Sequence, residues 1–434
     1  MVAATPSKPM TTKPNNSGSA GRPASTPASA ATASAAAALA LAARIPKLPF
    51  LMAGIACLIC GVWGGLLRLS VPVPMITEHA NWLTSHGALM TGGFLGTVIA
   101  LERAVGLQRP WAYLGPIATA VGGVLILFGV MGTASAWCMV AGSLLFSAVC
   151  VRIVLLQRVL FTWLMLVGAL CWVIGNVQWL RGAPMAAVVL WWMHFLGLII
   201  VGERLDLSRF QKRPNWSEGA LLAAVVVLVG GSLVTFADLK IGLRILGAGY
   251  VLIAAWLLRF DIARRSGRQP GLPRFMAVAL LSGFGWMAVS GALLLLAAPT
   301  ESGMLYDAAL HSFFLGFVMS MVFGHAPVIF PAILQLPLQF SARFYIHVGL
   351  LHLSLAVRVV GDLAESPAAR SWGAILNSVA MGVFLLSTIG SVIHGVVKSR
   401  QTVRAAAEAV RRKQQPGVEG IAPGSPRSSV LPAG

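Results

Sequence analysis

Residues 184–203, PMAAVVLWWMHFLGLIIVGE, decide the fold of this chain. The run carries one ionisable side chain, His194, before Glu203 closes it, and about 20 apolar residues are what a helix needs to cross a bilayer. The chain holds further runs of this kind. They cover residues 49–68, 85–104, 111–131, 135–155, 160–179, 218–236, 243–260, 274–297, 306–328, 342–360 and 373–397. The sequence therefore predicts an all-α, polytopic integral membrane bundle of about 12 transmembrane helices.

The composition of the whole chain supports this prediction. Charged residues make up 10% of the 434 residues, apolar residues make up 57%, and the mean hydropathy is +0.81. A soluble domain of this length is rarely so poor in charge. The lipid bilayer is therefore the predicted surrounding of most of the chain.

The positive charges predict an orientation. With both termini in the cytoplasm, 26 of the 32 Lys and Arg residues fall on the inner side. The other six are Arg68, Arg181, Lys240, Arg244, Arg358 and Arg370. Such an excess on one side is typical of the cytoplasmic face. Because the basic residues are scattered over many loops, no nucleic-acid partner is predicted.

The chain divides into three predicted parts. Residues 1–45 form a disordered cytoplasmic tail rich in Pro, Ser and Ala, and residues 46–398 form the twelve-helix membrane domain. Residues 399–434 begin with a basic cytoplasmic helix, expected to lie against anionic lipid, and end in a disordered tail. The pair Cys57 and Cys60 lies inside an apolar run, which favours packing over a disulfide or metal role.

Two histidines are predicted to lie near the same end of separate spans. His86 opens HGALMTGGFLG, and His311 lies in ALHSFFLGFVMSMVFGHAP, about 7 Å in from the end of its span. Burying an imidazole in a membrane is costly unless it is bonded. Imidazole is also the usual protein ligand of haem iron and copper. We therefore expect His86 and His311 to face each other across a haem.

Four other histidines are predicted to lie deeper. They are His194, His325, His347 and His352. Without nearby carboxylates or thiolates they suit copper or haem iron better than magnesium or calcium, and a second metal site among them is the prediction. The alternative is that they bond only protein groups and rigidify the bundle.

Two motifs resemble the NnrS family of bacterial inner-membrane proteins. SHGALMTGGFLG supplies His86, Met90, Gly93 and Phe94, and the second motif supplies Ala309-Leu310-His311 with Gly324-His325 later. The resemblance covers two of the twelve spans. The first motif of the family contains a second histidine that this chain lacks, and Ser85 precedes His86 here. It implies a multi-pass protein of the bacterial inner membrane with haem and copper, associated with nitric oxide stress and denitrification.

A more distant resemblance is to the catalytic subunit of haem–copper oxidases. By position His86 and His311 would match its low-spin haem ligands, and His194 a copper ligand. Span seven has no histidine and span ten has no H-x-H, so an oxygen-reducing centre is not expected and enzyme activity is left open.

These patterns predict a haem protein, with copper as an option, that acts in electron transfer with a redox partner protein or in a nitric oxide-related response. The alternative is a cofactor-free transporter or channel whose histidines line the path. An absorption spectrum separates the two.

Overall fold

The computed structural model describes residues 41, 44–74, 81–130, 132–299 and 302–414. The predicted tails at 1–45 and 415–434 lie largely or wholly outside these residues. Within the described part the chain is helical and contains no strand. Twelve of its helical segments are long and apolar enough to cross a membrane, which confirms the predicted all-α polytopic bundle.

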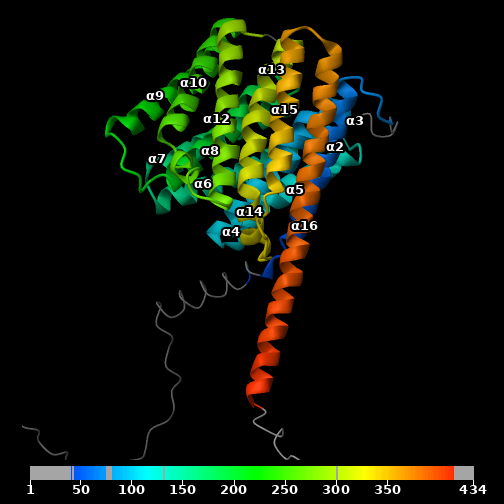
Figure 1. Cartoon of the computed structure of the whole chain (residues 1–434). Helices are drawn as coiled ribbons and strands as arrows, with labels where there is room; N and C mark the ends of the chain where they lie inside the picture. The colour runs from blue at the N-terminus through cyan, green and yellow to red at the C-terminus, as the bar shows by residue number, and fades with distance from the viewer. Residues whose placement is uncertain (1–40, 42–43, 75–80, 131, 300–301, 415–434) are drawn as a thin grey trace, which may run out of the picture.

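The helices run alternately up and down the bundle (Figure 1). The first six spans are α2 (Leu48–Arg68), α3–η2–α4 (Asn81–Ala88, Leu89–Gly96, Thr97–Leu107), η3–α5 (Pro110–Tyr113, Leu114–Leu127), α6 (Thr133–Leu156), α7 (Leu160–Leu180) and α8 (Met185–Leu207). The last six are α9 (Trp216–Val234), α10 (Leu239–Phe260), α12 (Leu272–Ala297), α13–η4–α14 (Met304–His311, Ser312–Met319, Ser320–Leu334), α15 (Phe344–Leu363) and α16 (Pro367–Gln414), with the short α11 (Ala263–Ser266) between α10 and α12.

Residues 185–203 of the apolar run form most of α8, the most buried span. A helix that is apolar on every side is suited to the centre of a bundle. Small residues allow the helices around it to approach closely. A Cβ on Gly247 of α10 would lie 2.5 Å from the Gly291 carbonyl of α12. Cys57 fills space beside Gly93 and Gly123, where added Cβ atoms would lie 2.8 and 2.6 Å from its Sγ, so the predicted packing role is confirmed.

The last helix differs from its prediction. The sequence separates a span at 373–397 from a basic helix lying along lipid, whereas α16 is one helix from Pro367 to Gln414. Its second half projects straight from one end of the bundle (Figure 1), because no Gly or Pro after Gly395 interrupts its backbone hydrogen bonds. We call this end of the bundle the tail end. The opposite end carries Arg68, Met304 and Pro367.

Candidate functional site

His86 lies on α3, near the end of the bundle opposite the tail end, and its ring is fixed by α2. The ring Nδ1 lies 2.6 Å from the Gly61 carbonyl oxygen, and a Cβ on Gly65 would lie 3.0 Å from the ring Cε1. A carbonyl oxygen only accepts, so Nδ1 carries the hydrogen, and in a neutral ring Nε2 then has the free lone pair. The glycine pair of α2 thus allows the close approach that selects one tautomer of His86.

His311 is fixed in the same chemical way. Its Nδ1 lies 3.0 Å from the Asp307 carbonyl oxygen and 3.2 Å from Asp307 Oδ1. Nδ1 is therefore again the donor. Neither Nε2 has a protein partner among the described residues. Histidines that bind a metal commonly donate their other ring N–H to a carbonyl or carboxylate, which is the arrangement that both rings adopt.

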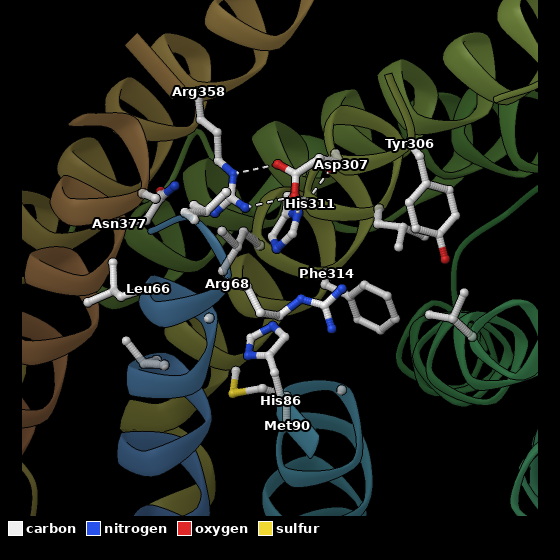
Figure 2. Close-up of a pocket in the computed structure, with 18 of the residues that line it drawn as sticks. Leu66, Arg68, His86, Met90, Tyr306, Asp307, His311, Phe314, Arg358 and Asn377 are labelled. Carbon is white, nitrogen blue, oxygen red and sulfur yellow. Dashed lines mark hydrogen bonds and ion pairs between the residues drawn. The ribbon is translucent and has the colours of Figure 1, made fainter. Parts of the chain in front are cut away.

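The two rings line one cavity. Their centres are 6.4 Å apart, their planes are inclined by 26°, and the cavity has a volume of about 430 Å³ (Figure 2). A metal ion between two imidazoles lies about 2 Å from each nitrogen, and each nitrogen lies roughly 1 Å from its ring centre, so facing rings stand roughly 6 Å apart. The observed separation fits that value.

Each histidine lies shortly before a change in helix type. α3 passes into the π-helix η2 two residues after His86, and α13 passes into the π-helix η4 directly after His311. π-Helical turns inside α-helices are rare and frequently occur at functional sites. Two spans far apart in the sequence therefore each have a π-helix beside a histidine.

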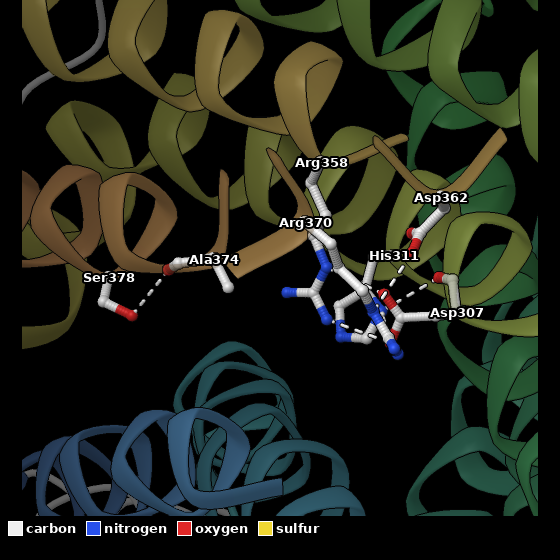
Figure 3. Close-up of polar contacts among 7 residues, drawn as sticks. All are labelled: Asp307, His311, Arg358, Asp362, Arg370, Ala374 and Ser378. Carbon is white, nitrogen blue, oxygen red and sulfur yellow. Dashed lines mark hydrogen bonds and ion pairs between the residues drawn. The ribbon is translucent and has the colours of Figure 1, made fainter. Parts of the chain in front are cut away.

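The cavity is bordered by an ionic network (Figure 3). Asp307 accepts hydrogen bonds from Arg358 Nε at 2.8 Å and Nη2 at 3.0 Å, and Arg370 Nη2 lies 3.3 Å from its Oδ1. Arg370 Nε also lies 3.1 Å from Asp362 Oδ1. The carboxylate that holds His311 is therefore itself held by two guanidinium groups. From the sequence, Arg358 and Arg370 were used only to predict the orientation of the chain in the membrane. Arg358 lies inside an apolar run, where an ionisable side chain indicates a functional site, so the sequence did carry a signal for it.

The four deeper histidines lie in separate surroundings in the described structure. His194 is bonded through both nitrogens, 2.8 Å from Ser232 Oγ and 3.1 Å from Tyr250 Oη. His325 contacts the Met321 carbonyl oxygen at 2.8 Å and Arg204 Nη1 at 3.2 Å.

His352 is also bonded twice, to Ser282 Oγ at 2.8 Å and to Trp286 Nε1 at 3.0 Å. His347 has only Ser387 Oγ, 3.2 Å from Nδ1, and its ring is packed among Phe275, Phe323, Phe344 and Phe384. No three His, Cys, Asp or Glu side chains converge on a metal position in the described part of the chain. His194, His325 and His352 are thus bonded to protein groups through both nitrogens, whereas Nε2 of His347 is buried without a partner in the described structure.

Two ion pairs involving buried or partly buried side chains lie near the tail end. Arg103 binds Glu203, and Arg204 binds Asp261 at 2.8 and 2.7 Å. The contact between Arg204 and Asp261 joins residues 57 positions apart and left no local signal in the sequence.

Comparison with known proteins gives one finding about the family. The model described as "Domain of unknown function (DUF8744)" matches residues 47–393, which is the whole bundle apart from the projecting part of α16. No curated protein matches the chain.

Proposed function

We propose that this chain, which belongs to the DUF8744 family, is a haem protein that carries electrons, with His86 and His311 as the two axial ligands of one iron. One observation carries the proposal. Both histidines bond a backbone carbonyl through Nδ1, so two lone-pair Nε2 atoms remain on rings 6.4 Å apart in one cavity.

The number of protein ligands also favours this cofactor. A porphyrin supplies four nitrogens to its iron, so two imidazoles complete the coordination, whereas a bare ion usually takes three or more protein ligands. Bound haem would supply one-electron redox chemistry. The protein's part is to hold both rings in one tautomer and to surround the cavity with helices that keep most water out. If both histidines hold the iron, no open position would be left for a gas, which favours electron transfer over gas binding.

The proposed location and role of the protein follow from the distribution of its Lys and Arg residues and from its resemblance to the NnrS family. The 26 to 6 distribution of Lys and Arg supports cytoplasmic termini with the cavity near the outer face of the membrane, and the resemblance to the NnrS family supports the bacterial inner membrane. The resemblance to the NnrS family adds a role in the nitric oxide response. The proposal has no copper centre, because three of the four deeper histidines have both ring nitrogens bonded to protein.

The absorption spectrum of the purified protein tests the proposal. We expect a Soret band and the sharp visible bands of six-coordinate haem on reduction. His86→Ala and His311→Ala should each lose or shift these bands, because one axial nitrogen is removed. His394→Ala is the matched control, since that exposed histidine lies on α16 away from the cavity.

The competing function is an anion path without a cofactor. It is favoured by Arg68, Arg358 and Arg370, which line the same cavity. A colourless preparation that takes up no added haem, or two alanine variants with the wild-type spectrum, would contradict the haem proposal.

A further inference from the structure

The cavity carries more positive than negative charge. Arg68, Arg358 and Arg370 line it, and Asp307 is the one acidic residue among its lining. Arg358 and Arg370 are engaged by Asp307 and Asp362. Arg68, in contrast, has no hydrogen-bond or ion-pair partner in the described part of the chain, and its side chain reaches into the cavity beside His86 and Phe314 (Figure 2).

A buried amide gives a second, independent observation. Asn377 of α16 lines the cavity, is 3% exposed, and accepts a hydrogen bond from Ser354 Oγ at 2.7 Å through its Oδ1. Its Nδ2 is buried and has no partner in the described structure. Buried polar atoms are nearly always bonded, so an orphan donor in a cavity wall indicates a missing acceptor.

Other polar atoms of this wall are already satisfied. Ser378, the next residue of α16, also lines the cavity, but its hydroxyl donates to the Ala374 carbonyl at 3.0 Å. Arg68, which is exposed, and the buried Asn377 thus leave donors free on two different helices, beside the buried Nε of Arg370, which has an ion-pair contact but no hydrogen bond.

We infer that Arg68 and Asn377 bind carboxylate groups of the ligand, which on the proposed function are the two propionates of haem. A guanidinium and an amide N–H₂ are strong donors to carboxylate oxygens. Two carboxylates also neutralise the excess charge of the cavity. The ligand of this site should therefore carry carboxylate groups, in addition to an iron that two imidazoles can bind.

The test compares haem with its dimethyl ester, in which both carboxylates are blocked. Asn377→Asp keeps the side-chain shape and the acceptor for Ser354 but replaces the free donor with a carboxylate. Arg68→Gln removes the free charge. Ser378→Ala and Arg244→Gln are the controls, because the Ser378 hydroxyl is bonded within its helix and the exposed Arg244 lies outside the cavity.

We expect N377D and R68Q each to speed haem loss to a scavenger protein by about tenfold or more, since each removes a hydrogen bond to a charged group. The dimethyl ester should leave the wild type faster than haem does, and the two variants should speed its loss no further. Thermal unfolding of the haem-free R68Q variant should match that of the wild type, because the exposed Arg68 has no hydrogen-bond or ion-pair partner in the described part of the chain.

Two results distinguish a failure of the carboxylate contacts from a failure of haem binding. If N377D and R68Q release haem as slowly as the controls, or weaken haem and ester equally, the carboxylate assignment is overturned while His86 and His311 still bind haem. If the wild type binds neither molecule, the haem proposal fails, and this inference fails with it.

Discussion

At the scale of single residues, Asp307 links the ligand ring to the bundle. Its carbonyl oxygen and its carboxylate both contact His311 Nδ1, and the same carboxylate binds Arg358 in bidentate fashion. Asp307 lies on α13 and Arg358 on α15, so one side chain couples the orientation of an imidazole to the packing of two spans.

We expect Asp307→Asn to lower the free energy of unfolding by about 3 kcal/mol, because it leaves buried guanidinium charge without its partner. Asp206→Asn breaks the exposed contact with Arg209 and should cost less than about 1 kcal/mol. Equilibrium unfolding in detergent measures both. Equal losses in the two variants would show that the Asp307 network does not stabilise the bundle.

The residue scale also shows where sequence reasoning stops. Matched depth on two spans predicted that His86 and His311 would meet, because even-numbered spans run in the same direction. Both ring nitrogens of His194 are bonded, one to Ser232 and the other to Tyr250, and these two partners lie on other helices. Their contact depends on helix rotation, which a single sequence does not specify. The orphan amide of Asn377 depends on the same three-dimensional packing.

At the scale of elements, the spans were predictable to within a few residues, apart from longer extensions such as that of α16. A bilayer requires long apolar helices whatever their packing, so hydropathy alone finds them. The π-helices η2 and η4 were not predicted, because a local change in hydrogen-bond register leaves no composition signal. α16 was predicted in two pieces because its composition changes from apolar to basic after Val397, although its backbone does not bend there.

The projecting part of α16 should be dispensable for the bundle. Residues 401–411 are all exposed, and apart from the backbone bonds of the helix a hydrogen bond runs from the Thr402 side chain to the Lys398 carbonyl of the same helix. Tolerance of truncation follows from such exposure. A chain that ends at Arg400 should keep the thermal midpoint within about 2 °C.

The same truncated chain should keep the visible spectrum of the full chain. A control chain that ends at Phe384 loses the last part of the span and should not assemble. A large drop in midpoint on removal of residues 401–434 would mean that the tail packs on the bundle.

At the scale of the whole molecule, twelve spans put the start of α2 and the projecting part of α16 at one end, and the cavity near the other (Figure 1). An even number of spans returns the chain to the side from which it entered. The cavity therefore opens on the side opposite the basic tail.

Reporter fusions test this arrangement in cells. A reporter joined after Val71, between α2 and α3, should be active only outside the cytoplasm, and one joined after Arg411 only inside. A third reporter after Pro299, between α12 and α13, should agree with the first. A cytoplasmic result at either outer position would contradict twelve spans with internal termini.

The straight course of α16 also determines how far its charges lie from lipid. Arg411 follows Lys398 by 13 residues, so it lies about 20 Å farther along the helix axis at 1.5 Å per residue. Electrostatic attraction decays over about 8 Å at physiological salt. A guanidinium group at that distance from the membrane is screened from anionic headgroups and remains available to an acidic partner in solution. The helix thus acts as a rigid spacer, with membrane attraction confined to its base.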